Sequence, residues 1–115
     1  VPDSEVRHYG ILEVNRDLGP GVFEARRVVE KPRPEQTQSR WSLPGRYVFT
    51  GEIFDAIRSL GTRPGQEIQL SEAISNLASE GKVCGVEFRG DRFDVGNLEG
   101  LVRTNQILWE RGLKK

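Results

Sequence analysis

The sequence has only one cysteine, no excess of either charge and no long apolar run. A single thiol excludes an internal disulfide, and no Cys/His cluster offers a zinc site, so we expect a reducing, cytoplasmic setting. Basic and acidic residues number 17 each, which leaves no positive excess for nucleic acid or an anionic membrane surface to attract. The apolar stretches are far shorter than the ~20 residues that a bilayer span needs. The sequence therefore argues against nucleic-acid and membrane partners.

The N-terminus lacks both an apolar segment and a starting methionine. Residues 1–7 are mostly polar or charged, which is not the pattern of a signal peptide. We expect them to come from the interior of a longer polypeptide. The 115 residues, 36% hydrophobic and 30% charged, have the length and composition of a single folded domain.

Four runs rich in β-forming residues predict strands, at 9–14, 22–30, 41–49 and 83–88. The first two would form a hairpin through residues 15–21, which are dense in turn formers. Prolines 32 and 34 would end the second strand, and Gly45 would break the third. Cys84, in the fourth, is expected to be an inert core residue.

Three stretches with apolar residues at helical spacing predict helices, at 51–60, 72–80 and 98–109. Thr50, Ser71 and Asn97 stand where side-chain N-caps are expected. Trp109 would lie on a wide apolar face of the last helix, which suits either a core or a contact between subunits. The predicted order of elements is β, β, β, α, α, β, α.

Short motifs then point to a family. They are, in chain order, Tyr9-Gly10, Glu30-Lys31-Pro32, Pro44-Gly45-Arg46-Tyr47-Val48-Phe49, Glu67-Ile68-Gln69-Leu70-Ser71 and Phe93-Asp94-Val95-Gly96-Asn97. Their order and spacing resemble the C-terminal part of the bacterial UTP–glucose-1-phosphate uridylyltransferases, a branch of the sugar-nucleotide pyrophosphorylases. The resemblance extends from about Val1 to Trp109.

The resemblance implies an α/β fold, the C-terminal portion of a Rossmann-like nucleotidyltransferase, with a mixed β-sheet and flanking helices. Residues 1–115 would form a single partial domain, the half that binds the sugar phosphate. The sequence contains no Gly-rich loop between a strand and a helix to hold a nucleoside triphosphate. We therefore expect the N-terminal nucleotide-binding half to be absent and the chain to be inactive alone.

The reaction implied is the formation of UDP-glucose and pyrophosphate from UTP and glucose 1-phosphate, with Mg²⁺ as cofactor and a homo-oligomeric enzyme. Two alternatives stay open. The chain could be a detached, inactive binding or assembly module, or part of a nucleotidyltransferase for another nucleotide or sugar.

By this resemblance Lys31 contacts phosphate and Glu30 accepts hydrogen bonds from sugar hydroxyls. A carboxylate can accept from two neighbouring hydroxyls, and the ammonium of a lysine is a compact charge for phosphate. Taken without the resemblance, Glu30 and Lys31 would be a solvated pair at an exposed strand end.

The resemblance makes Asp94 the metal ligand, and Mg²⁺ commonly takes one or two carboxylates together with phosphate oxygens and water. Asp94 could instead cap the last helix. Gly10 and Gly45 are implied to contact the sugar, although turn or bulge glycines are commoner. Pro44 departs from the family pattern, in which a β-branched residue precedes that glycine, and this leaves the backbone path at Gly45 open.

Overall fold

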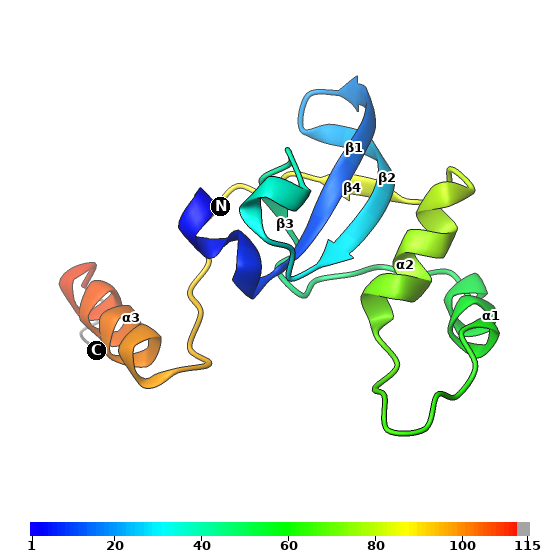
Figure 1. Ribbon diagram of the computed structural model, residues 1–115. Coiled ribbons are helices and arrows are strands. Elements are labelled where there is room, and N and C mark those ends of the chain that lie inside the picture. Colours follow the sequence, from blue (N-terminus) through cyan, green and yellow to red (C-terminus); the bar gives the residue numbers. More distant parts are fainter. Residues whose placement is uncertain (113–115) are drawn as a thin grey trace.

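A curled antiparallel sheet lies at the centre of the computed structural model, which describes residues 1–112 (Figure 1). Its strand order is β3-β1-β2-β4, with β1 at Gly10–Gly19, β2 at Val22–Glu30, β3 at Trp41–Ser42 and β4 at Cys84–Val86. Every pairing among the described strands is antiparallel, so the expectation of a mixed sheet is wrong for this part of the chain. A two-residue turn joins β1 to β2, whereas parallel neighbours would need a long crossover.

The hairpin is longer than predicted. Residues 15–19 continue β1, and the chain turns only at Pro20 and Gly21, with positive φ at Gly19 and Gly21. The polar residues that suggested a turn are held in the ladder by cross-strand contacts, since Asn15 and Arg16 both donate to a carboxylate oxygen of Glu24, at 2.8 and 2.9 Å. Irregular register near Val14 bends the hairpin into its curled form.

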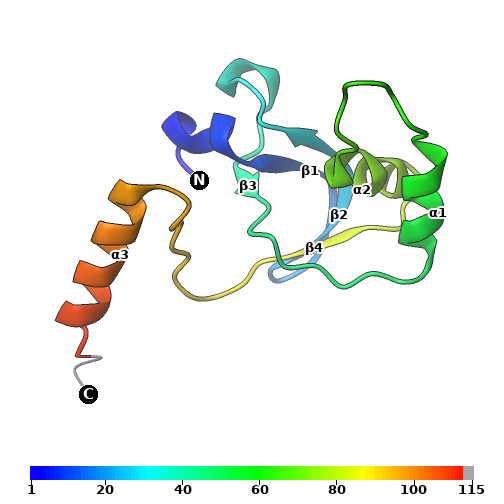
Figure 2. The same ribbon diagram turned by 90° about the horizontal axis from the view of Figure 1, so that it is seen from below.

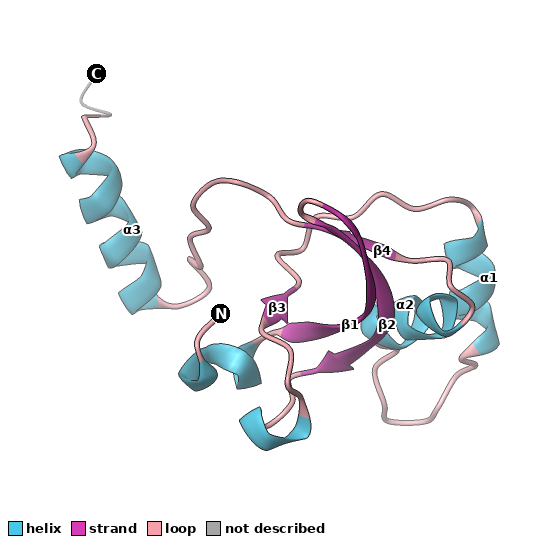
Figure 3. Ribbon diagram, turned by 90° about the horizontal axis from the view of Figure 1, so that it is seen from above, coloured by secondary structure: helices cyan, strands magenta, loops and turns pink. Residues whose placement is uncertain are grey.

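Two helices cover one face of the hairpin (Figure 3). Helix α2, Leu70–Ser79, packs on β2, and α1, Glu52–Ser59, packs on α2. Ala73 is fully buried and lets α2 approach the sheet closely. Two clusters of buried residues form the core: Leu12, Phe23, Ala25 and Ala78, and Val28, Ile53, Ala73 and Ile74.

The helices α1 and α2 are where the apolar spacing places them, but their caps differ. The N-cap of α1 is Gly51, not Thr50, whose hydroxyl instead donates to Glu52. Helix α2 begins two residues earlier than expected, at Leu70, so that Ser71 lies in its first turn with a buried, unbonded hydroxyl. The spacing of apolar residues determines which face of a helix is buried, but it determines the first residue of the helix only to within one or two positions.

The predicted third strand is mostly wrong. Only Trp41–Ser42 pair with β1, and residues 43–50 have no regular structure. Pro44 cannot donate to a ladder, and Gly45 has a φ of 79°. Cys84 is exposed rather than core, because β4 is a three-residue edge strand and it is the neighbouring Gly85 that lies against Phe23.

Helix α3, Leu98–Glu110, lies apart from the sheet at the end of an extended connection (Figure 2). Its predicted N-cap is confirmed, since the side chain of Asn97 accepts from the Gly100 N–H at 2.8 Å. No residue of α3 is buried, so its apolar face does not contribute to the core. None of the helices in residues 1–112 is long and apolar enough to cross a membrane. Two short 3-10 helices, Asp3–His8 and Pro34–Gln36, complete the structure.

Candidate functional site

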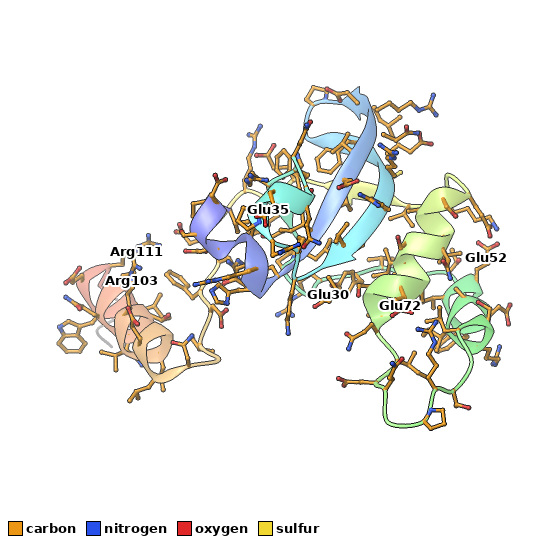
Figure 4. All side chains as sticks on the ribbon, in the orientation of Figure 1. Glu30, Glu35, Glu52, Glu72, Arg103 and Arg111 are labelled. Atoms are coloured by element: carbon orange, nitrogen blue, oxygen red, sulfur yellow. The ribbon has the colours of Figure 1, made fainter. Side chains whose placement is uncertain are left out.

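Glu30 is the last residue of β2 (Figure 4), and Lys31 follows it directly. Lys31 is the one described non-glycine residue with a positive φ, 43°, a conformation that costs free energy and is found disproportionately at functional sites. Its N–H donates to the carbonyl of Tyr9 at 3.1 Å, which fixes the turn. Both side chains are exposed, and within residues 1–112 they form no ion pair with each other or with another group. The exposure of both side chains agrees with the alternative of solvated charges at a strand end, and their contact with a sugar phosphate stays a prediction.

Gly10 lies opposite Glu30 in the β1–β2 ladder. A Cβ at Gly10 would lie 3.1 Å from Oε2 of Glu30 and 3.4 Å from the side chain of Leu43, so the absence of a side chain leaves room for the glutamate. Burial, and after it the negative charge of Glu30, raises the pKa of Tyr47. The Glu30 carboxylate thus lies beside Gly10 of β1, and its charge acts on Tyr47.

Gly45 lies in this same segment, in a turn that its positive φ permits and that a side chain would strain. The segment is tied to β1 because the Leu43 N–H donates to the carbonyl of Gly10 at 2.9 Å. The structure therefore brings Gly10 and Glu30 together and places the 43–47 segment beside them. Gly45 itself has open space around its Cα, and contact of Gly10 or Gly45 with a sugar stays a prediction.

Asp94 lies in the connection before α3 and does not cap that helix. Its Oδ1 accepts from the Gly96 N–H at 2.9 Å and its Oδ2 accepts from the Tyr9 hydroxyl at 3.0 Å. These two hydrogen bonds, first that of Gly96, lower the pKa of Asp94 below its ordinary value, with a smaller contribution from the nearby charge of Arg92. The carboxylate is exposed and held ionised by its neighbours.

An ionised, exposed carboxylate with lone pairs to spare fits a hard divalent cation. No group of three or more His, Cys, Asp or Glu side chains in residues 1–112 is arranged to hold a metal. The donor set therefore fits Mg²⁺ held by one carboxylate with oxygens from phosphate and water, and it does not fit an all-protein metal cage.

Three residues near Asp94 were not identified from the sequence. Tyr9 donates to its carboxylate, Arg92 lies over the Tyr9 ring, and Gly100 faces its backbone. A Cβ at Gly100 would overlap the carbonyl oxygen of Asp94, so α3 can begin here only with a glycine at this position. The Tyr9-Gly10 motif is the one sequence feature that points toward any of them, and it does so through its glycine.

A larger hollow, of about 720 Å³, lies elsewhere, between the hairpin and residues 35–41. None of the five predicted site residues lines it. Two of its charged side chains are already paired, Arg27 with Glu13 and Arg40 with Asp3, each at 2.6 Å, and it is wide open to solvent. We therefore place the candidate site around Glu30, Lys31 and Asp94.

Residues 1–111 match the model of the family described as nucleotidyl transferase. The chain belongs to this family. A UTP–glucose-1-phosphate uridylyltransferase of Pseudomonas aeruginosa is 37% identical over 112 residues, which are 96% of this chain and 39% of that protein. The enzyme of the same name from Staphylococcus epidermidis is 38% identical over 104 residues, covering 90% of this chain and 36% of the relative.

Solved structures agree with the nucleotidyl transferase assignment. A UDP-glucose pyrophosphorylase complexed with UDP-glucose matches 96% of this chain and 42% of its own, with a TM-score of 0.85 and 32% identity. The UDP-glucose pyrophosphorylase of Acinetobacter baumannii matches 99% of this chain and 39% of its own, with a TM-score of 0.77 and 30% identity. The chain thus spans about two fifths of the length of the relatives it matches.

Proposed function

We propose that this chain supplies the sugar-phosphate side and one metal ligand of a cytoplasmic UTP–glucose-1-phosphate uridylyltransferase. The observation that carries the proposal is that Lys31 and Asp94 converge on one residue: Tyr9 accepts from the Lys31 N–H and donates to the Asp94 carboxylate. The backbone of Lys31 and the carboxylate of Asp94, from distant parts of the chain, thus both contact Tyr9. The proposal includes two further points. The segment is the C-terminal part of such an enzyme, and it forms a partial domain that binds the sugar phosphate.

The residues have distinct parts in the proposed reaction. Transfer of this kind depends on positioning and charge neutralisation more than on covalent help. The Lys31 ammonium, which has no internal partner in the described chain, binds the phosphate of glucose 1-phosphate and stabilises the charge that shifts when this phosphate attacks the α-phosphorus of UTP. Glu30 accepts from sugar hydroxyls and orients the ring, and Gly10 leaves space beside it. Mg²⁺ bound at Asp94 would neutralise negative charge on the phosphate oxygens.

A binding measurement on the 115-residue chain tests this proposal without requiring turnover. Glucose 1-phosphate is titrated into ¹⁵N-labelled chain, and amide shifts are expected at Gly10, Glu30 and Lys31. Lys31→Ala should abolish them, while Lys82→Ala, at a lysine paired with Glu52 and Glu80, should leave them unchanged. Shifts confined to the hollow at residues 35–41, or no shifts at all, would contradict the proposal.

The same preparation tests the expectation that the chain is inactive alone. In-line transfer needs both substrates held in register. Incubation with UTP, glucose 1-phosphate and Mg²⁺ should release no pyrophosphate above background. Release at the rate of a full-length relative would show that this segment holds a complete site.

A further inference from the structure

Tyr9 occupies the junction between the first 3-10 helix and β1, and it makes contacts in two directions. Its backbone carbonyl accepts from the Lys31 N–H at 3.1 Å, beside the end of β2. Its hydroxyl donates to Oδ2 of Asp94 at 3.0 Å, across 85 positions of the sequence. One residue therefore connects the strained backbone of Lys31 to the carboxylate of Asp94.

The ring of Tyr9 is held by its surroundings. The guanidinium carbon of Arg92 lies 4.1 Å from the ring centroid, which is cation–π distance. The His8 and Tyr9 rings form a T-shaped pair with 6.4 Å between their centroids. Arg92 also approaches Glu5 at 4.0 Å, and its side chain is only 26% exposed, so it is itself restrained. Arg92 and Asp94 lie on the same short segment, which therefore contacts Tyr9 at two places: Arg92 at the ring face and Asp94 at the hydroxyl.

We propose that Tyr9 is a positioning residue, which fixes the orientation of the Asp94 carboxylate relative to Lys31. The inference rests on the proposed function and adds a residue to it. Around metal sites, the hydrogen-bond partners of a ligand typically affect affinity or activity by about 10- to 100-fold. Asp94 is exposed and lies in a connection without regular structure, so few other contacts limit its rotation. Gly96 holds one oxygen from within the same turn, and among residues 1–112 only Tyr9, next to β1, holds the other oxygen from another part of the chain.

The substitution Tyr9→Phe separates positioning from packing, because it keeps the ring beneath Arg92 and removes only the hydroxyl. The first measurement is hydrogen exchange of the Gly96 amide in the 115-residue chain, since this N–H donates to the same carboxylate. We expect exchange to accelerate by about 3- to 10-fold, the range that a modest net hydrogen bond corresponds to. The Gly100 amide, held by Asn97 in the next turn, should keep its rate.

Tyr47→Phe is the matched control, since it removes the other tyrosine hydroxyl of the chain. It should leave the Gly96 rate unchanged. If Tyr9→Phe also leaves Gly96 exchange unchanged, Tyr9 acts only through its ring and the inference is overturned. If both Gly96 and Gly100 accelerate together, the hydroxyl supports the whole connection rather than the carboxylate, and the inference is likewise overturned.

A second measurement uses Mn²⁺ as a paramagnetic substitute for Mg²⁺ and needs no turnover. Mn²⁺ added to the unsubstituted chain should broaden the amide resonances of residues 94–96, and Tyr9→Phe should raise the Mn²⁺ concentration for half-broadening by about 10-fold. Equal broadening in both proteins would contradict the role of Tyr9. Absence of broadening at Asp94 in the unsubstituted chain would instead contradict the metal role in the proposed function, while the Gly96 exchange result would still stand.

Discussion

At the scale of single residues, the clearest departure from ordinary geometry is Lys31. A lysine has no steric reason to adopt a φ of 43°, yet its backbone is held there by Tyr9 and followed by a buried proline. Its ammonium nevertheless stays exposed and without an ion pair in the described chain. A phosphate ligand would explain both features, because its negative charge would pair with the ammonium that the strained backbone of Lys31 holds in place.

The site residues make a prediction about a complete enzyme containing this segment. Lys31→Ala and Asp94→Asn should each lower kcat by about 100-fold or more, because both act on charge that shifts in the transition state. Glu30→Gln should mainly raise KM for the sugar phosphate. Steady-state kinetics check this, with Lys82→Ala as the control expected to match the parent. Small, equal effects of all three substitutions would mean that these are ordinary surface residues.

A second residue-scale prediction concerns Glu13 and Arg27, which face each other in the β1–β2 ladder. Nε and Nη2 of Arg27 donate to the two oxygens of Glu13 at 2.6 and 3.2 Å. These hydrogen bonds, only partly offset by burial, lower the pKa of Glu13 from its ordinary value of 4.5. Because the carboxyl pKa is depressed on folding, the pair stabilises the fold above pH 4.5. That stabilisation is lost as the pH falls through the lower folded-state pKa.

Glu13→Gln should therefore reduce the free energy of unfolding at pH 7 by about 0.5–1 kcal/mol, a modest value because the Arg27 side chain is 52% exposed. The deficit should disappear when urea unfolding is repeated well below pH 4. Glu35→Gln is the control, since Glu35 and its partner Arg33 are both mostly exposed and lie 3.4 Å apart. A deficit for Glu13→Gln that persists at low pH would assign its effect to packing instead of charge.

At the scale of elements, periodicity predicted which segments are helices and strands better than where they begin and end. The stripes of apolar residues placed α1, α2 and α3 correctly. The third strand failed because Pro44 and Gly45 outweigh the β-forming residues that follow them. The hairpin was underestimated because the polar residues of its tip are stabilised by cross-strand partners that a single strand cannot reveal.

The same limit applies to the candidate site. Motifs along the chain were enough to select Glu30, Lys31 and Asp94, each of which stands at the end of an element or in the turn before one. Tyr9 and Arg92 could not be selected, because their part depends on a contact between the two ends of the chain. The sequence predicts Gly100 only as part of a helix, because its close approach to the Asp94 carbonyl oxygen depends on how the preceding connection folds.

Gly100 gives the element-scale prediction. Helix propensity alone would have Gly100→Ala stabilise α3, by about 1 kcal/mol. At the candidate site we expect the substitution to be disruptive, because the new Cβ would overlap the Asp94 carbonyl oxygen and displace the Asp94 backbone. We expect large amide shifts over residues 94–97 with unchanged circular dichroism.

Gly51→Ala is the comparison variant, because Gly51 is also at a helix start, has a φ of −59° and faces open space. It should alter stability by less than about 0.5 kcal/mol and leave residues 94–97 unshifted. If Gly100→Ala left the resonances of residues 94–97 in place, the close approach of α3 to Asp94 would not exist in solution.

At the scale of the whole molecule, the chain exposes more surface than its size requires. Its accessible area is 8750 Å², against about 6,300 Å² expected for a compact monomer of 13.0 kDa. Its radius of gyration, 16.4 Å, compares with about 13 Å for a compact domain of this length. Helix α3 contributes to both differences, with Leu98 77% and Trp109 63% exposed.

The sheet adds an uncovered edge to this surface. β3 and β4 flank the β1–β2 hairpin in the sheet. β3, however, pairs only with Ile11 and Leu12, so the rest of that side of β1 has no partner strand in residues 1–112. Exposed strand edges of this kind pair readily with other strands.

The homo-oligomer implied by the resemblance is thus also a physical expectation for the 115-residue chain, and we propose that α3 or the β1 edge is buried against a second copy. The excess of about 2,400 Å² over a compact monomer is larger than the roughly 800 Å² that each partner commonly buries in a specific interface. Sedimentation velocity at tens of micromolar should show an oligomer. Val102→Glu, which places a charge on the exposed face of α3, should shift it toward monomer if α3 is the contact, while Arg58→Glu on α1 should not. A monodisperse monomer of the unsubstituted chain would rule out self-association and show that α3 keeps its exposed face in solution.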